Sequence, residues 1–263
     1  MLITPVLRKG GKSQNARKIA ELLPRHRVYV EPFCGGAAVF FAKKRSDVEV
    51  LNDLDPMIFN FFRFLRDDPA SLFAEVERLG FGEDAYELAC SVHLGSEAVS
   101  DLTSGALCLI LSRTSYGGSG KNMKTGYTES KKDLIERILR RLADFSSRMR
   151  GVVLHNKDAL SVMRQYDSPD TCLFVDPPYI GATFKYSHDV NHDELFEFCL
   201  KAESKILLAG YSYLEDFARE HGWAVHKFKF RDILTIQRDD YIIANFSHGT
   251  QLSLFDMEGN NGK

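Results

Sequence analysis

Short apolar segments alternate with helix-compatible segments in both halves of this chain, and the connections between them are short. The segments expected to form strands are residues 28–30, 48–51, 152–154, 172–175 and 206–209. This alternation predicts an α/β fold, in which a parallel sheet is covered by helices. Residues 223–230 alternate apolar and polar side chains, and residues 241–246 are expected to return beside them as an antiparallel hairpin that completes the sheet.

The alternation stops between residues 67 and 150, where helical periodicity is interrupted by a glycine-rich loop at 115–122. We therefore expect a mainly helical inserted domain at 67–150. The catalytic domain would consist of 1–66 together with 151–250, and 251–263 would form a tail.

Capping residues predict where two helices begin. Asp55 followed by Pro56 has the chemistry that starts a helix, and Ser13 is expected to cap an earlier helix that ends at Pro24. The helix after Pro56 carries four phenylalanines that we expect in the core: Phe59, Phe61, Phe62 and Phe64.

The composition is that of a globular chain, with 263 residues of which 44% are hydrophobic and 27% charged. The longest apolar runs, such as residues 106–111, fall far short of the ~20 residues that span a bilayer, so an intracellular protein is expected. Five scattered cysteines without a C-x-x-C pair indicate neither a disulfide framework nor a zinc site. His188 and His192 are four residues apart, but they are not expected to share a helical face, so no metal is predicted.

Charge is segregated along the chain although its formal net value is only −2. Residues 1–30 contain seven Lys or Arg and one acidic residue, and residues 113–150 contain ten and four. Two basic segments on an acidic body are compatible with a nucleic-acid partner. The alternative for residues 131–150 is a solvated helix face.

A glycine turn and an acid occupy the ends of the first two expected strands. Pro32-Phe33-Cys34-Gly35-Gly36 follows the first strand and Asp53 follows the second. In an open parallel sheet, such a turn lets the backbone approach a ligand, and an acid about twenty residues on binds a ribose. The turn lacks the G-x-G-x-x-G spacing of a pyrophosphate site, which favours a nucleoside cofactor. The alternative is a structural turn with Asp53 as a helix cap.

The motif Asp176-Pro177-Pro178-Tyr179 follows an apolar strand. In this position it resembles the catalytic motif of amino-methyltransferases. Together with the glycine turn and with Arg8-Lys9-Gly10-Gly11-Lys12, it is similar to the Dam-like, alpha-ordered DNA adenine methyltransferases. The resemblance extends from Pro5 to Phe246, and the order of the motifs is that of the family.

This resemblance implies a Rossmann-like S-adenosylmethionine-dependent methyltransferase sheet with an antiparallel terminal strand and an inserted target-recognition domain. It implies S-adenosylmethionine as cofactor, with Lys12 near its methionine part, Asp53 at its ribose and Asp158 at its adenine amine. The full set of implied cofactor-binding residues is Arg8, Gly11, Lys12, Pro32, Phe33, Gly35, Asp53, Asp158 and Asp176. The chain departs from the family pattern in Arg8, where many members have an aromatic residue, and in Ala37, which replaces a glycine.

The implied catalytic residues are Asp176, Pro177, Pro178 and Tyr179. The exocyclic nitrogen of adenine is a poor nucleophile, so Asp176 and the Pro177 carbonyl are expected to accept its N–H bonds while Tyr179 stacks on the flipped base. The prolines restrict the segment, and no covalent nucleophile is required. The expected reaction is methylation of adenine N6 in double-stranded DNA.

The glycine-rich loop resembles the recognition loop found at this point in the family. Its expected DNA contacts are Arg113, Tyr116, Lys121, Asn122 and Lys124, which offer phosphate and base-edge donors. A solvated surface loop is the alternative.

Other functions remain open at this stage. One is methylation of a different amine, in cytosine N4, RNA adenine or protein glutamine. A nucleotide-dependent oxidoreductase is disfavoured by the missing pyrophosphate loop, and an inactive DNA-binding module is disfavoured by the intact acids.

The tail contains Gln251-Leu252-Ser253-Leu254-Phe255, which resembles the peptide by which bacterial DNA polymerases and repair proteins bind the sliding clamp. Gln251, Leu252, Leu254 and Phe255 would make the contacts. The alternative is that these residues fold back onto the core. We expect a monomer or weak dimer in the cytoplasm of a bacterial or phage-infected cell, associated with the nucleoid.

Overall fold

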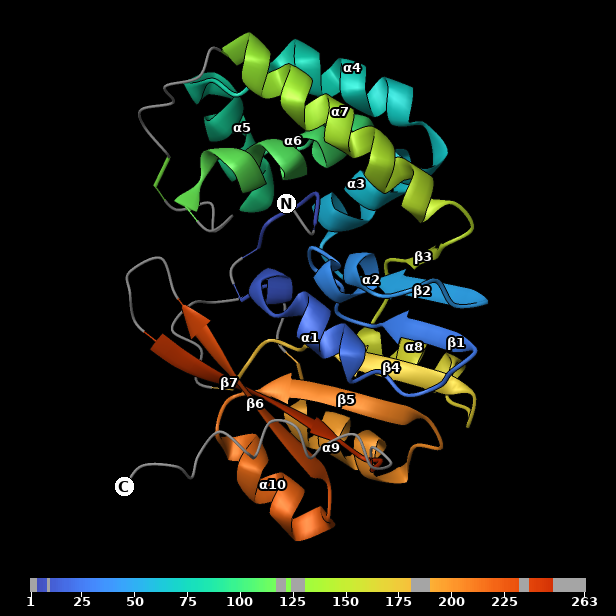
Figure 1. The fold of residues 1–263 in the computed structure, drawn as a ribbon. Helices are drawn as coiled ribbons and strands as arrows, with labels where there is room; N and C mark the ends of the chain where they lie inside the picture. Colours follow the sequence, from blue (N-terminus) through green and yellow to red (C-terminus); the bar gives the residue numbers. More distant parts are fainter. Residues whose placement is uncertain are drawn as a thin grey trace, which may run out of the picture.

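The computed structural model describes residues 4–8, 10–116, 122–123, 131–180, 190–231 and 237–247. Within these residues, seven strands form one sheet in the order β3-β2-β1-β4-β5-β7-β6 (Figure 1). The strands are β1 (Val28–Glu31), β2 (Val48–Asn52), β3 (Val153–His155), β4 (Thr171–Val175), β5 (Lys205–Gly210), β6 (Ala224–Arg231) and β7 (Gln237–Ala244).

The strand order creates a switch point between β1 and β4. The chain moves outward from β1 to β2 and β3, then returns to place β4 on the other side of β1, and all these pairs are parallel. In an open α/β sheet, ligands bind at the carboxyl ends of strands beside such a switch point. The Rossmann-like prediction is therefore confirmed, and the carboxyl ends of β1, β2 and β4 form the edge at which a ligand is expected.

The last strand in the described part of the chain, β7, is antiparallel to both β5 and β6. This confirms the predicted antiparallel terminal strand and the hairpin. In space, however, β7 is not at the edge of the sheet, because β6 pairs on its outer side.

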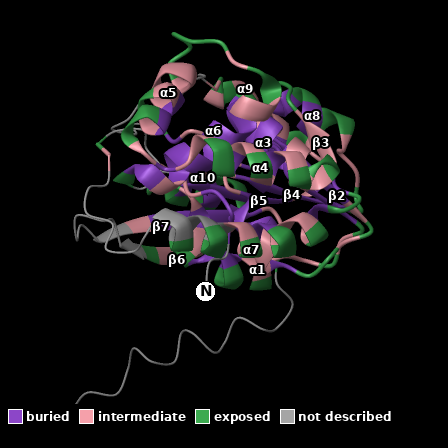
Figure 2. Ribbon diagram, turned by 90° about the horizontal axis from the view of Figure 1, so that it is seen from above, coloured by how far each residue is buried: buried purple, intermediate pink, exposed green. Residues whose placement is uncertain are grey.

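Helices cover both faces of the sheet (Figures 1 and 2). In chain order the helical segments are the 3-10 turn η1 (Lys12–Gln14), α1 (Ala16–Glu21), α2 (Ala38–Ala42), α3 (Pro56–Asp67), α4 (Pro69–Leu79), α5 (Glu83–His93), α6 (Asp101–Thr114), α7 (Lys131–Met149), α8 (Ala159–Gln165), α9 (His192–Lys201) and α10 (Tyr213–His221). Apolar residues of α1, α2 and α3 share one core with Tyr29 of β1, whereas those of α8, α9 and α10 share another with Val30. Successive strand residues point to opposite faces, so both faces are buried.

The segment from α4 to α7 is helical, as predicted, and lies above the sheet in Figure 1. Its central helix is α6, in which residues 106–111 are all buried. A Cβ at Gly105 would lie 3.0 Å from the backbone of both Asn60 and Phe61, so glycine permits α6 to cross α3 closely. Because α3 also packs on the sheet, with Phe61 and Phe62 buried, the core is continuous from the sheet into the insert.

The capping predictions had different outcomes. Asp55 accepts a hydrogen bond from the Met57 backbone N–H at the start of α3, as expected. The prediction for Ser13 was wrong, because α1 begins at Ala16 and ends at Glu21. The preceding residues form η1, and the Asn15 side chain donates to the Lys229 carbonyl of β6.

No helix among the described residues is long and apolar enough to cross a membrane.

Candidate active site

The glycine turn after β1 and the acid after β2 are hydrogen-bonded to each other. The Gly35 N–H donates to Asp53 Oδ2 over 2.8 Å, and the Asp55 N–H donates to Asp53 Oδ1 over 3.0 Å. A Cβ at Gly36 would lie 2.3 Å from the Val6 carbonyl oxygen, so this glycine lets the amino-terminal segment pass over the turn. Ala37, which replaces the family glycine, has a φ of 52°, in the left-handed region that glycine adopts most easily.

Asn52 holds three segments of this edge together. Its side-chain amide donates to the carbonyls of Pro32, at 2.8 Å, and Lys157, at 3.1 Å, and its Oδ1 accepts from the Lys157 N–H at 3.0 Å. The residue is 1% exposed. Asn52 thereby fixes the end of β2 against the glycine turn and against the segment that leads into Asp158.

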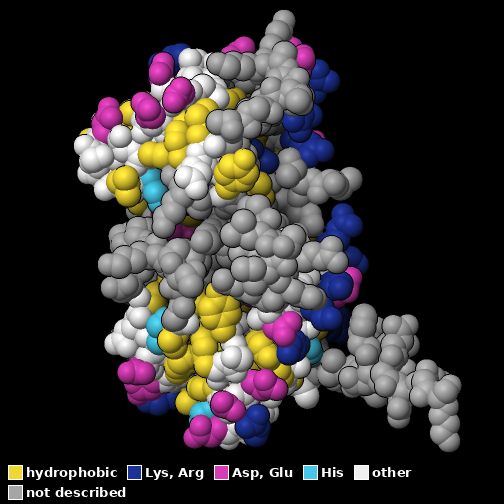
Figure 3. All heavy atoms as spheres, turned by 90° about the vertical axis from the view of Figure 1, so that its left-hand side faces the viewer, with side chains coloured by type: hydrophobic (Ala, Val, Ile, Leu, Met, Phe, Trp, Pro, Cys, Tyr) yellow, Lys and Arg dark blue, Asp and Glu magenta, His cyan; other side chains and the backbone are white. Residues whose placement is uncertain are grey.

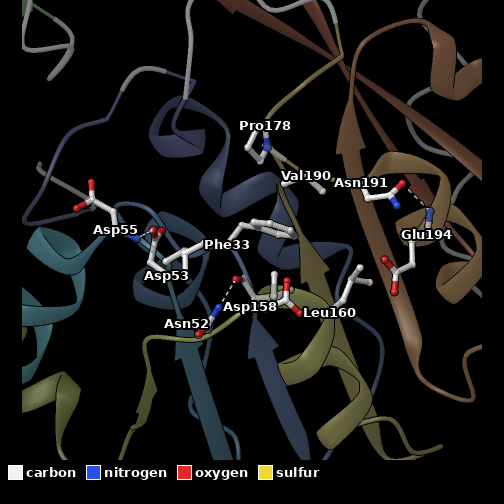
Figure 4. A pocket seen from close by; sticks show the side chains of 13 residues that line it. Phe33, Asn52, Asp53, Asp55, Asp158, Leu160, Pro178, Val190, Asn191 and Glu194 are labelled. Atoms are coloured by element: carbon white, nitrogen blue, oxygen red, sulfur yellow. Dashed lines mark hydrogen bonds between the residues drawn. The ribbon is translucent and has the colours of Figure 1, made fainter. Parts of the chain in front are cut away.

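A cavity of about 290 Å³ opens at the carboxyl edge of the sheet (Figure 4). Five predicted site residues line it: Pro32, Phe33, Asp53, Asp158 and Pro178. The cavity thus joins the turn after β1, the acid after β2, the start of α8 and the motif after β4.

The other residues that line this cavity were not predicted as site residues from the sequence: Asn52, Leu54, Asp55, Ala159, Leu160, Val190, Asn191 and Glu194. Some had a usable signal, because Asn52 and Asp55 flank the predicted acid and Ala159 follows Asp158. Asn191 caps α9 by accepting from the Glu194 N–H, so it could have been found as the start of the helix that follows the catalytic strand.

Burial first, and then the neighbouring Asp55 carboxylate, raise the pKa of Asp53 to about 6, although the N–H donors of Asp55 and Gly35 lower it. The Cys34 thiol beside the turn has a pKa raised well above its usual range, first by burial and then by Asp53. It is therefore not a thiolate near neutral pH.

Arg8 forms an ion pair with Asp55, which is itself the cap of α3. Both side chains are largely buried, at 17% and 12% exposure. The guanidinium thus meets a residue of the cavity wall, while the Gly11 N–H donates to the Arg8 carbonyl and closes a tight turn. The predicted cofactor contacts of Arg8 and Gly11 stay predictions.

Lys12 connects the amino-terminal motif to the catalytic motif. Its ammonium donates to Asp176 Oδ1 over 2.7 Å and to the Gly10 carbonyl over 2.9 Å. The same nitrogen lies 4.8 Å from the ring centroid of Tyr179. Because the Lys12 side chain is only 3% exposed, this charge is held close to the acid.

Tyr179 is 9% exposed and packs edge-to-face on Tyr211, which follows β5, with ring centroids 4.7 Å apart. Pro177 is buried, and Pro178 is partly exposed at the cavity. The four residues of the tetrad therefore lie between the cavity and the end of β5. Stacking of Tyr179 on a flipped base stays a prediction.

The chain matches the model of the D12 class N6 adenine-specific DNA methyltransferases over residues 9–205. It belongs to this family. A curated relative, the Type II methyltransferase M1.LlaDCHI of Lactococcus lactis subsp. cremoris, is 23% identical over 197 residues, which cover 68% of each protein. An rRNA methylase structure from Streptococcus thermophilus aligns with a TM-score of 0.38 and 12% identity, covering 88% of this chain and 93% of that one.

Membership of the D12 class establishes the general activity. The protein is an adenine-specific DNA methyltransferase, its substrate is DNA, and the class as a whole implies S-adenosylmethionine as methyl donor. The predicted family and reaction are therefore confirmed. The same match favours DNA adenine over the other substrates considered, which were cytosine N4, RNA adenine and protein glutamine, and over a nucleotide-dependent oxidoreductase.

The predicted DNA-binding residues of this methyltransferase are only partly described. Arg113 is half-buried and donates to the Pro5 carbonyl, whereas Tyr116 and Asn122 are exposed. The Tyr116 N–H donates to the Asn122 carbonyl over 3.4 Å, which brings the two ends of the loop together. Several predicted residues lie outside the described part of the chain: Lys121, Lys124, His188, Gln251, Leu252, Leu254 and Phe255.

Helices α1 and α7, which come from the two basic segments predicted from the sequence, face the same side of the methyltransferase. Figures 1 and 2 both place α1 and α7 on the same side, and Lys and Arg side chains line the corresponding margin of the face in Figure 3. Exposed members are Arg17 and Lys18 on α1 and Arg137 and Arg140 on α7.

Proposed function

We propose that this methyltransferase binds S-adenosylmethionine in the cavity at the carboxyl ends of β1, β2, β3 and β4, and methylates N6 of an adenine flipped out of double-stranded DNA. The observation that carries the proposal is the meeting of five predicted residues, from four separate segments, in one cavity of about 290 Å³. This volume is close to the lower end of the range for small-molecule sites.

The chemistry of the cavity wall fits the adenosine part of the cofactor. Carboxylates accept hydrogen bonds from hydroxyl and amine groups, and Asp53 and Asp158 offer them on either side of the cavity. Both hydrogen bonds that Asp158 accepts within α8 end on Oδ2, which leaves Oδ1 to accept an amine. Phe33 and Leu160 supply apolar contact for a purine ring. We assign Asp53 to the ribose hydroxyls and Asp158 to the purine amine.

The tetrad supplies acceptors for the target amine. Asp176 uses Oδ1 for Lys12, so its Oδ2 and the Pro177 carbonyl can accept the two N–H bonds of adenine N6. These hydrogen bonds stabilise the positive charge that develops on the amine nitrogen during transfer. Bound S-adenosylmethionine supplies an electrophilic methyl group on a positively charged sulfur.

The target base has to leave the duplex, because pairing hides its amine. Tyr179 is assigned to stacking on the flipped base, and the basic side formed by α1 and α7 is assigned to DNA phosphates. The segment from Arg113 to Lys124 is assigned to contacts with the recognised sequence, with Tyr116 and Asn122 as its described exposed members.

The proposal is tested by incubating the full chain with tritiated S-adenosylmethionine and unmethylated plasmid DNA, followed by hydrolysis and separation of the nucleosides. Label is expected in N6-methyladenine, and duplex DNA is expected to be a better substrate than matched RNA. Asp176→Ala protein serves as the control for contaminating methyltransferases. Label in N4-methylcytosine, or equal labelling by the control, would overturn the assignment.

A further inference from the structure

A buried acid on β7, Asp240, lies at the catalytic edge. Because β7 is antiparallel to β5, its first half lies where β5 ends, and Tyr241 pairs with Gly210, the last residue of β5. Asp240 is the residue before this pair and is 7% exposed. The strand places it next to the tetrad, although it comes from a segment outside the matched residues 9–205.

The Lys12 ammonium lies close to two carboxylates. It donates to Asp176 Oδ1 at 2.7 Å, and Asp240 Oδ2 lies 3.9 Å from the same nitrogen. The side chains of Lys12, Asp176 and Asp240 are 3%, 18% and 10% exposed, so the surrounding solvent screens these charges weakly. One positive charge is thus shared between two negative ones.

This charge balance matters for the reaction assigned to Asp176. A lysine paired with Asp176 alone would neutralise much of its charge and weaken the acceptor for the target amine. A second carboxylate near the same ammonium offsets that loss, because it balances part of the positive charge.

We propose that Asp240 is a positioning residue for methyl transfer, which acts through Lys12 to keep Asp176 a strong acceptor. The inference rests on the proposed function, in which Asp176 accepts an N–H of the target adenine. It assigns Asp240 no contact with DNA or cofactor, so its removal should affect the transfer step rather than binding.

Asp240→Asn removes the charge while keeping the shape of the side chain. We expect the single-turnover rate of methyl transfer to fall roughly tenfold or more, because an ammonium that is no longer balanced by Asp240 weakens Asp176 as the acceptor for the target amine. The dissociation constants for DNA and for the cofactor product should change by less than about twofold. A rate equal to that of the wild type, or a loss explained by weaker binding, would overturn the proposal.

The neighbouring acid provides a matched control. Asp239 is on the same strand, points to the opposite face, and pairs with Lys227 over 2.8 Å at 38% exposure. Asp239→Asn makes the same chemical change and should leave the rate within about twofold of the wild type. An equal loss of rate in both variants would indicate a general effect on β7 and would overturn the specific role.

A double substitution tests whether Asp240 acts through Lys12. In Lys12→Gln protein, measured with enzyme in excess, adding Asp240→Asn should lower the rate less than about threefold, because no ammonium remains to be balanced. A further full tenfold loss would contradict the proposed route.

If Asp240→Asn does not fold, Asp240→Glu replaces it as the test, because it keeps the negative charge. This variant should keep at least half of the wild-type rate, and a tenfold loss in the folded variant would overturn the proposal. The proposed function is tested separately by whether the wild-type protein produces N6-methyladenine. Its failure is therefore distinguishable from failure of the role proposed for Asp240.

Discussion

The Gly35 N–H and the Asp53 carboxylate are 2.8 Å apart, so the glycine turn of β1 and the acid of β2 form one hydrogen-bonded unit. The turn cannot move without disturbing the acid, and the acid cannot rotate without losing a backbone donor. Since Asp53 Oδ1 also accepts from the Asp55 N–H, the carboxylate is held with its remaining lone pairs available to the cavity.

Replacing Asp53 by alanine should weaken cofactor binding by about 1 to 3 kcal/mol, the range for hydrogen bonds to a charged acceptor. Calorimetric titration of the folded protein with S-adenosylmethionine measures the effect. Asp170→Ala is a suitable control, because that side chain is 72% exposed at the opposite edge of the sheet. Unchanged affinity in Asp53→Ala protein would remove this residue from the cofactor site.

Cofactor affinity should decrease as the pH falls through about 6. Burial, reinforced by Asp55, raises the pKa of Asp53 to about 6 in the free protein, and only the ionised carboxylate can accept the ribose hydroxyls while keeping both backbone donors. Because the cofactor binds the ionised form of Asp53, protonation of this carboxylate lowers the affinity. The affinity should be constant above about pH 7 and decline by at most tenfold per pH unit below 6. Asp53→Asn protein should bind weakly and without this dependence between pH 5 and 7.5; a parallel decline in both proteins would assign the titration to another group.

The parts of the structure that the sequence predicted are those governed by local pattern. Short apolar segments, the Asp55-Pro56 helix start and the motif after β4 all have strong signals within a few residues, and their elements are where the pattern places them. The cofactor edge followed from these elements, because parallel strands all end at one side of a sheet.

The remaining features depend on contacts between distant segments. The ion pair of Arg8 with Asp55 joins residues 47 apart, and the placement of Asp240 beside Lys12 depends on an antiparallel strand that begins, rather than ends, at the catalytic edge. The predicted cap at Ser13 failed for the same reason, since Asn15 forms a tertiary hydrogen bond to Lys229 and α1 starts later. A search for acidic residues directly after parallel strands does not find a residue such as Asp240, which is placed by contacts between distant segments.

Asp176→Ala should abolish methyl transfer, with a loss of at least about a hundredfold in single-turnover rate, while DNA binding persists. Tyr179→Ala should lower the rate less, because it removes stacking but leaves the acceptors of the amine in place. Rapid-quench assays of transfer and polarisation assays of DNA binding separate the two effects. Substantial turnover by the Asp176 variant would exclude this carboxylate as the hydrogen-bond acceptor for the target amine.

Arg8→Met should destabilise the fold, because it leaves the Asp55 carboxylate largely buried without its partner. We expect a loss of about 2 to 3 kcal/mol in the free energy of unfolding, somewhat below the range for a fully buried pair. Urea denaturation measures it, and a second substitution, Asp55→Asn, should recover part of the loss by removing the unpaired charge. Additive losses in the double variant would show that the pair is not energetically coupled.

Glu31→Gln should change how stability depends on pH. Burial raises the pKa of Glu31 to about 8, against an unfolded value near 4.5, although hydrogen bonds from Tyr29 Oη and the Phe40 N–H, both 2.7 Å to Oε1, oppose the shift. Between these two pKa values the folded state holds more protons than the unfolded state, so this contribution to stability is complete below about pH 4.5 and is lost as the pH rises through about 8.

Glutamine keeps an oxygen that can accept both hydrogen bonds but does not titrate, so the variant should gain stability relative to the wild type as the pH is raised from 5.5 to 8.5. The difference between the two proteins should grow by at most about 1.4 kcal/mol per pH unit. Urea denaturation at several pH values in this range provides the measurement, with the m-value checked for constancy. If the difference in free energy of unfolding between the two proteins does not change with pH, Glu31 is already ionised across this range. The positive charge of Lys43 and the hydrogen bonds from Tyr29 and Phe40 would then hold Glu31 in its ionised form.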